Sequence, residues 1–181
     1  PLIDNLAPAA SMSSSANDMC HWLIALLDSG KFENRQVISS EAIFAIRSPQ
    51  TIIKMDQREN IYSHFYLYGL GFMLSDRDGK IVVSHTGGVD GFVSSVLMVP
   101  EEKLGVVVLT NTDQNTFFQS LTNEIRDAFL GLPFTNYSLK SLRHFNEEEF
   151  SNSRWLDSLN NIISKHNTPA IELKNYSGIF T

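Results

Sequence analysis

One stretch constrains the fold of this chain more than any other: residues 80–111 read KIVVSHTGGVDGFVSSVLMVPEEKLGVVVLTN. Runs of β-branched residues separated by turn-forming residues are typical of antiparallel strands with short connections. The pattern predicts strands over residues 81–83, 92–99 and 106–110. Between the first two runs stands the motif His85-Thr86-Gly87-Gly88. Glycines in this context mark a turn, a bulge or a close approach to the strand, so the motif fits both a plain turn and the edge of an active site.

The residues before residue 84 predict helices followed by further strands. Ser15 and its serine neighbours can cap a helix that runs to Gly30, and Ser39 or Ser40 can begin a shorter helix that ends before Pro49. Residues 50–63 are expected to form a loop. Residues 66–74 alternate in character and predict one strand, and a turn over residues 76–79 is expected to close a hairpin.

After the strands, the apolar stripe of residues 118–129 predicts a helix that ends at Gly131. A helix on an antiparallel meander of up to four strands is an α+β fold. Beyond Pro133 the composition becomes more polar, and Asn146 followed by three glutamates predicts the start of a connecting helix. The expected organisation is a domain over residues 1–133, a connecting helix and spacer over 134–167, and a linker with one strand of a truncated β-domain over 168–181.

Composition excludes several classes of protein. The 181 residues are 43% hydrophobic and 19% charged, which is ordinary for a globular protein, and no apolar run has the length of a membrane span. The net charge is −6, without a basic stripe, so a nucleic-acid partner is not expected. The single cysteine, Cys20, excludes an internal disulfide and a cysteine-cluster metal site.

Three segments together resemble a known family. They read PAASMSSSANDMCHWLIALLDSG, YGLGFML and SHTGGVDGFVSSVLMVPEEKLGVVVLTN, and in this order and spacing they resemble the C-terminal half of the serine beta-lactamase-related hydrolases. That family includes class C beta-lactamases, penicillin-binding proteins of the D-alanyl-D-alanine carboxypeptidase type, and related esterases and peptidases. The resemblance covers residues 7–133 and implies a beta-lactamase/transpeptidase-like α+β fold, present as an incomplete C-terminal portion.

Family members use three motifs, of which this sequence carries one clearly. The motif S-x-x-K, which carries the nucleophile, is absent, and so is Y-x-N. Two matches to S-x-N, at Ser15 and Ser158, are better explained by helix ends and surfaces. The third motif, K-T-G or H-x-G, matches His85-Thr86-Gly87. The resemblance therefore implies that the nucleophile and its base lie upstream of Pro1.

The resemblance also assigns expected roles to the residues of the motif. The backbone N–H of Gly88 would be one oxyanion donor, and that of the absent nucleophilic serine the other. Thr86 and His85 would bind substrate, and Gly87 with Gly88 would let an acyl group approach the strand closely. A histidine in place of the usual lysine is mostly neutral at pH 7 and favours ester, peptide or amide substrates over efficient beta-lactam hydrolysis.

Structural explanations stand beside these functional ones. Gly87-Gly88 could be only a bulge or turn, and His85 a strand residue with one hydrogen bond. The aromatic residues Tyr62, Tyr66 and Tyr68 could line a pocket but are more often packing at strand positions. No metal and no cofactor are expected, because the remaining histidines are interpreted as surface or hydrogen-bonded residues: His21, His64, His144 and His166.

Two functional classes follow. The first is a serine hydrolase that works through an acyl-enzyme on ester, peptide or amide substrates, including peptidoglycan-like or beta-lactam compounds; this chain alone would be inactive. The second is a non-catalytic ligand-binding or scaffold protein on the same fold. The strand that begins at Gly105 and ends at Thr110 is expected to pair with the N-terminal half of the protein or with a second copy. A periplasmic or extracellular location is expected from the resemblance.

Overall fold

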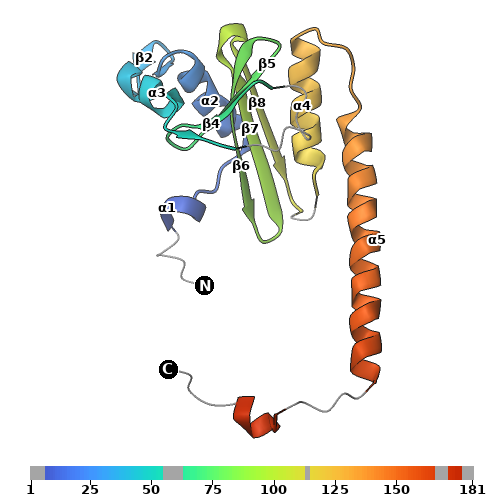
Figure 1. Cartoon of the computed structure of the whole chain (residues 1–181). Helices are drawn as coiled ribbons and strands as arrows, with labels where there is room; N and C mark the ends of the chain where they lie inside the picture. Colours follow the sequence, from blue (N-terminus) through green and yellow to red (C-terminus); the bar gives the residue numbers. More distant parts are fainter. Residues whose placement is uncertain (1–6, 55–62, 113–114, 166–170, 177–181) are drawn as a thin grey trace. The chain divides into compact units, whose positions relative to one another are not determined.

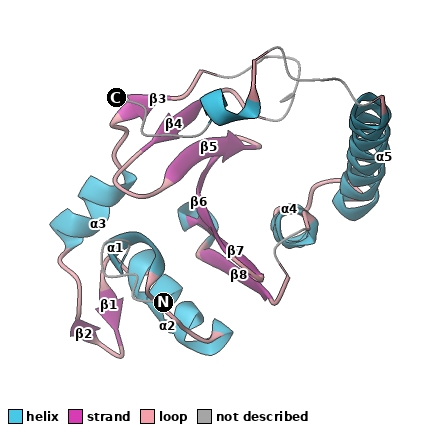
Figure 2. Cartoon of the chain, turned by 90° about the horizontal axis from the view of Figure 1, so that it is seen from below, coloured by secondary structure: helices cyan, strands magenta, loops and turns pink. Residues whose placement is uncertain are grey.

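The computed structural model describes residues 7–54, 63–112, 115–165 and 171–176. The chain divides into two compact units, Pro1–Leu139 and Lys140–Thr181. The first unit holds a six-stranded antiparallel sheet in the order β3-β4-β5-β6-β7-β8. Helices cover both faces of this sheet (Figure 1, Figure 2), so the expected α+β class is confirmed.

The bounds of the elements are as follows. The helices are α1 (Ala7–Ala10), α2 (Ala16–Leu27), α3 (Ser40–Arg47), α4 (Phe117–Phe129) and α5 (Tyr137–Ser164), with short 3-10 turns η2 (Pro100–Glu102) and η3 (Leu173–Tyr176). The strands are β1 (Lys31–Phe32), β2 (Arg35–Gln36), β3 (Thr51–Ile52), β4 (Tyr66–Tyr68), β5 (Met73–Arg77), β6 (Lys80–Val89), β7 (Phe92–Val99) and β8 (Leu104–Thr110). The strands β1 and β2 form a separate small hairpin that the sequence analysis did not predict.

The sheet separates the core into two apolar clusters. On one face, Leu26 of α2 packs with Val83 and Met98. On the other face, Phe118 of α4 packs with Val82. Val82 and Val83 are neighbours in β6 but belong to different clusters, because successive side chains of a strand point to opposite faces. Helices therefore pack against both faces of the sheet where β6 carries Val82 and Val83.

Helix α2 forms where the serines predicted it and lies very close to β8. The Ser15 side chain caps the helix by accepting a hydrogen bond from the Asp18 backbone N–H at 3.1 Å. At Gly105 a Cβ atom would lie 3.2 Å from Leu27 Cδ1 and 3.3 Å from Leu23 Cβ. The missing side chain of Gly105 thus allows the helix to pack tightly on this strand.

The expectation of one strand over residues 66–74 was wrong. The segment folds back on itself as β4 and β5, with Gly71 at φ +89° and a hydrogen bond from Gly69 N–H to Phe72 O at 2.8 Å. The glycines of the alternating pattern form a turn, and Gly71 supplies the positive φ that other residues rarely adopt. The expected loop over 50–63 also contains β3, which pairs with β4, and residues 55–62 lie outside the described residues.

The turn expected over residues 76–79 is shorter than predicted. Only Asp78 and Gly79 form it, both at positive φ, and Arg77 pairs with Lys80. Asp76 and Arg77 belong to β5 and are buried. Asp76 and Arg77 thus form hydrogen bonds within the fold, although two consecutive charged residues suggest a solvent-exposed turn.

The second unit begins within α5, and this helix starts earlier in the chain than the predicted start at Asn146. The helix starts at Tyr137, where Asn136 Oδ1 accepts a hydrogen bond from the Leu139 N–H at 2.7 Å. Asn146 therefore lies inside the helix and does not begin it. Residues 173–176 form a 3-10 turn where a strand was expected, since an isolated strand has no partner, and residues 177–181 lie outside the described residues. None of the described helices is both long and apolar enough to cross a membrane.

Candidate active site

The His85-Thr86-Gly87-Gly88 motif lies in a continuous strand and is not a turn. β6 runs through it to Val89, and the turn comes afterwards, with Gly91 at φ +85°. On one side β7 pairs with β6 along the whole motif. On the other side the pairing with β5 stops at Ser84, which lies opposite Met73. After Ser84, β6 therefore has a strand neighbour on one side alone among the described residues.

The hairpin between β6 and β7 decides which way the backbone amides of β6 face. In an antiparallel ladder, alternate residues exchange hydrogen bonds with one neighbour, and the residues between them face the other side. A two-residue turn joins the strands, so the alternation begins with Val89 bonded to Phe92 and continues at every second residue. Thr86 and Gly88 lie between these positions. Their N–H and C=O groups therefore point away from β7, toward the side on which β5 ended at Met73.

The two glycines of the motif have different surroundings. A Cβ atom added at Gly87 would lie 2.8 Å from the Ser94 hydroxyl oxygen, so contacts within the chain explain this glycine. A Cβ atom added at Gly88 would meet only Val93 Cγ1, at an ordinary 3.8 Å. Among the described residues, nothing in the fold requires Gly88 to lack a side chain. Its open surroundings suit the close approach of a ligand.

The predicted site residues are all exposed, but their side chains do not share one face. His85 and Gly87 belong to the face of Val83, whereas Thr86 and Gly88 belong to the opposite face. What the four residues share is the strand itself. The structure thus places a row of backbone groups at the site, with one side chain above the strand and another below it.

Tyr68 is the residue that the sequence analysis undervalued. Its hydroxyl lies 3.1 Å from His85 Nε2, and the two rings meet edge to face with their centroids 6.2 Å apart. β4 brings Tyr68 there because β4, β5 and β6 are consecutive strands of the sheet. The cluster of tyrosines before the first strand is the sequence signal for this contact, although tyrosines at strand positions more often serve packing. Tyr68 orients the imidazole of His85.

A second polar group surrounds Asp76, near the end of β5. Its buried carboxylate accepts hydrogen bonds from the Ser63 hydroxyl at 2.9 Å, from the His64 backbone N–H at 2.6 Å and from His64 Nδ1 at 2.5 Å. Burial alone would raise the pKa of Asp76, but these hydrogen bonds outweigh it and lower the pKa to about 2. The hydrogen bond to Asp76, and then its charge, raise the pKa of His64.

This group does not have the geometry of a catalytic triad. Ser63 bonds to the carboxylate and not to the imidazole, so the imidazole is not placed to take its proton. His64, interpreted from the sequence as a surface or hydrogen-bonded residue, bonds to Asp76. No group of three potential ligands that could hold a metal ion occurs among the described residues. The contacts tie residues 63–64 to β5.

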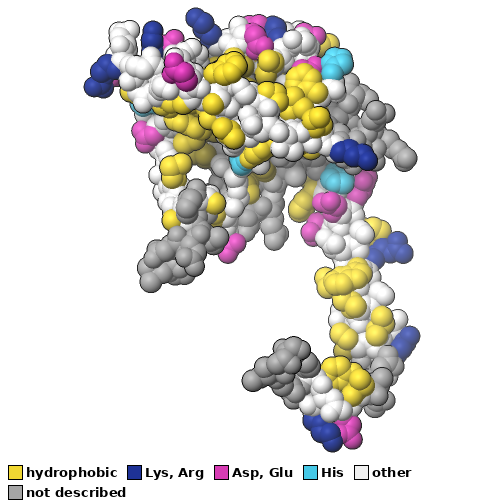
Figure 3. All heavy atoms as spheres, turned by 60° about the vertical axis from the view of Figure 1, so that its left-hand side comes forward, with side chains coloured by type: hydrophobic (Ala, Val, Ile, Leu, Met, Phe, Trp, Pro, Cys, Tyr) yellow, Lys and Arg dark blue, Asp and Glu magenta, His cyan; other side chains and the backbone are white. Residues whose placement is uncertain are grey.

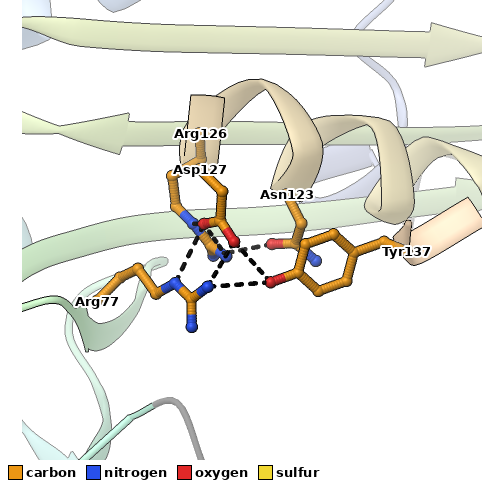
Figure 4. Close-up of polar contacts among 5 residues, drawn as sticks. All are labelled: Arg77, Asn123, Arg126, Asp127 and Tyr137. Carbon is orange, nitrogen blue, oxygen red and sulfur yellow. Dashed lines mark hydrogen bonds and ion pairs between the residues drawn. The ribbon is translucent and has the colours of Figure 1, made fainter. Parts of the chain in front are cut away.

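A third polar group is buried between β5, α4 and the first turn of α5 (Figure 4). Arg77 donates to Asp127 from Nε at 3.1 Å and from Nη2 at 2.5 Å, and the Tyr137 hydroxyl donates to Asp127 Oδ2 at 2.7 Å. Arg126 also bonds to Asp127 and, at 2.8 Å, to Asn123. The sequence does not predict this network, because residues so far apart in the chain give no local signal of their contact.

The ionisable side chains Asp127 and Tyr137 of this network each keep a single protonation state at neutral pH. Burial alone would raise the pKa of Asp127, but hydrogen bonds from Arg77 and Tyr137 and the charge of Arg126 outweigh it, so the pKa lies below its ordinary value. Burial, and then the hydrogen bond to Asp127, raise the pKa of Tyr137 to about 12. At neutral pH Asp127 is ionised and Tyr137 is not, which suits a group that stabilises the fold.

Comparisons with known proteins agree with this architecture. A family model described as Beta-lactamase matches residues 1–129. Among solved structures, the octameric penicillin-binding protein homologue from Pyrococcus abyssi matches with a TM-score of 0.55 and 21% identity. The match covers 66% of this chain and 25% of that one, so the chain spans about a quarter of the length of that protein. At this identity the likeness shows the fold alone. A search of curated proteins found no match.

Proposed function

Because this chain belongs to the beta-lactamase family, we propose that β6 forms the oxyanion side of a serine-hydrolase active site. The observation that carries the proposal is the open side of β6 after Ser84, toward which Thr86 and Gly88 direct their backbone groups. A rigid N–H group at such an edge can stabilise the negative charge that develops on a carbonyl oxygen. The site would work through an acyl-enzyme.

The chemistry assigns one task to each residue of the motif. A serine oxygen attacks the substrate carbonyl carbon, the carbonyl oxygen becomes negative, and the Gly88 N–H donates a hydrogen bond to it. The leaving group then departs, and water hydrolyses the acyl-serine. Thr86 and His85 bind the rest of the substrate, and Gly87, where a Cβ atom would clash with Ser94, lets β7 pack closely on β6 beside them. Their positions on opposite faces of β6 let them contact different parts of one substrate.

The nucleophile and its base are proposed to come from residues outside this chain. The sequence has no S-x-x-K motif, and an acyl transfer of this kind needs both a nucleophile and a group that takes its proton. The proposed substrates are esters, peptides or amides, among which peptidoglycan-like and beta-lactam compounds are candidates. These substrates are consistent with a proposed periplasmic or extracellular location.

Strand β8 is the proposed contact with the part of the protein that carries the nucleophile, or with a second copy. It is the last strand of the sheet, and the same alternation directs the amides of Val107 and Leu109 outward. When the partner is added, these two amides are expected to become protected from hydrogen exchange. Unchanged exchange at both would contradict pairing at this edge.

Active-site labelling tests the proposal. A fluorophosphonate probe or a fluorescent penicillin should label the complete protein at one serine and leave the 181-residue chain unmodified in an intact mass measurement. Labelling of the isolated chain would overturn the assignment of the nucleophile. A complete protein that binds a peptidoglycan-like ligand but is never labelled would favour the non-catalytic, ligand-binding alternative.

A further inference from the structure

Helix α5 carries a heptad pattern that the proposed function does not use. Positions spaced alternately by three and four residues form a single seam along the helix, and a sustained spacing of this kind is typical of helices that pack in coiled coils. The positions of the seam are Leu142, Phe145, Glu149, Asn152, Leu156, Leu159 and Ile163. All but two of them are apolar, and the two polar ones are consecutive in the seam.

The apolar side chains of this seam are exposed in the structure. Leu142 is 54% exposed, Leu156 52% and Ile163 70%, and Figure 3 shows hydrophobic side chains along the helix. Trp155 and Ile162 widen the seam on one side. Apolar side chains grouped in this way mark a surface that another protein segment covers.

Phe150 shows that not every apolar residue of α5 belongs to this seam. It is 67% exposed but lies outside the heptad positions. The guanidinium of Arg154 lies over its ring at 5.9 Å from the centroid, one helical turn further along. Phe150 therefore has a partner within its own helix, and it offers a matched control for the residues of the seam.

The order of residues in the seam is complementary to itself when read in reverse. In an antiparallel pair of helices, the two kinds of core position face each other. If Glu149 faces Asn152 of a second helix, then Leu142 faces Leu159 and Phe145 faces Leu156 on both sides of the centre. These four apolar residues meet apolar residues, Ile163 lies opposite Ser138 at the end of the pair, and the Asn152 amide can donate to the Glu149 carboxylate.

A parallel pair lacks this complementarity. It would place two Glu149 carboxylates in one layer, where like charges repel and neither can donate a hydrogen bond. Polar residues at core positions select register and orientation in coiled coils. The polar positions of α5 therefore select one arrangement of two helices over the other.

We propose that α5 associates with α5 of a second copy of this chain as an antiparallel coiled coil centred between Glu149 and Asn152. The surface is distinct from the β8 edge, and the proposal does not depend on the hydrolase assignment. The seam supplies the binding energy, and the central polar layer sets the register.

Sedimentation equilibrium of the 181-residue chain, with the exposed Cys20 replaced by serine, tests the association. A reversible dimer is expected. Leu156→Asp should raise its dissociation constant at least about tenfold, because a charge would be buried in the seam. Phe150→Asp makes a similar change in the same helix and should leave the constant unchanged. A chain that is monomeric at every concentration, or a dimer that survives Leu156→Asp, would overturn the proposal.

Cysteine cross-linking tests the orientation without relying on a destabilised variant. In the Cys20→Ser background, a mixture of Glu149→Cys and Asn152→Cys chains should form the mixed disulfide under mild oxidation, because these positions face each other only in the antiparallel register. Glu149→Cys alone should cross-link poorly. Efficient formation of a Glu149→Cys homodimer would indicate a parallel pair and would overturn the antiparallel arrangement.

Discussion

The two ends of β6 lie beside polar groups of opposite kinds. Near the turn that joins β5 to β6, Arg77 is buried, and its hydrogen bonds go to Asp127 and Tyr137 within the same chain. At the other end of β6, Thr86 and Gly88 are exposed, and no described strand pairs with their outward backbone groups. Polar groups of the first kind stabilise the fold, whereas those of the second kind remain available to a ligand.

This contrast predicts that substitutions at the two ends have separable effects. Changes in the buried network should lower stability wherever the fold is measured. Changes to the outward-facing groups of Thr86 and Gly88 should lower activity while leaving stability nearly unchanged. A substitution in the buried network that lowers activity but not stability, or a substitution of Thr86 or Gly88 that lowers stability, would show that the two regions are not independent.

The largest expected effect follows from Asp127→Asn. The change leaves the guanidinium groups of Arg77 and Arg126 buried without their counter-charge, which costs about 3–5 kcal/mol of unfolding free energy. Urea unfolding followed by circular dichroism measures it. The exposed carboxylate of Asp157 supplies a control, since Asp157→Asn should change stability by less than about 0.5 kcal/mol. A loss below about 1 kcal/mol for Asp127→Asn would contradict a structural role for the network.

Gly88→Pro should instead affect catalysis in the complete protein. It removes the proposed oxyanion donor and should lower kcat by at least about a hundredfold. Stability should change little, because the Gly88 N–H points away from β7 and does not take part in the ladder. Gly87→Pro is the comparison: its N–H faces β7, so this variant should lose stability. Equal kcat values for wild type and Gly88→Pro would remove β6 from the mechanism.

The contacts of Asp76 predict a pH window for stability. With its pKa lowered to about 2, Asp76 stabilises the fold above the ordinary carboxyl pKa, and this contribution is lost as the pH falls toward 2. With its pKa raised, His64 contributes below about pH 6.5 and loses its contribution as the pH rises through the folded-state value. The difference in unfolding free energy between wild type and Asp76→Asn should therefore be largest between about pH 4 and 6.5. A difference that does not vary with pH would contradict this account.

His85→Ala should lower activity less strongly than Gly88→Pro, mainly by weakening the binding of substrates that carry a carboxylate. The smallest effect is expected at Tyr68. Tyr68→Phe removes the hydroxyl that contacts His85 and should lower kcat/KM only a few-fold, the effect of one lost hydrogen bond. In a His85→Ala background, Tyr68→Phe should have no further effect, because Tyr68 acts through His85. Additive losses would show an independent role.

Prediction from the sequence succeeded where neighbouring residues carry the signal. The helix after Ser15 and the strands that flank Pro100 were predicted, because caps, turns and side-chain periodicity act over a few residues. Prediction failed where one local pattern has two explanations. The glycines at 69 and 71 fitted an alternating strand, and only the pairing of β4 with β5 shows that they make a turn.

For the candidate site, the residue types of the motif predicted a segment of strand whose glycines could let a ligand approach, and whether a ligand binds there stays a prediction. They could not show that β5 ends at Met73, or that Gly87 is explained by Ser94 while Gly88 is not. The Tyr68–His85 contact and the burial of Arg77 against Asp127 also required the folded chain. Local conformational preferences depend on adjacent residues, but an open strand edge or a buried ion pair depends on which distant segments come to lie beside it. Which distant segments lie side by side is determined by the packing of the whole sheet and its helices.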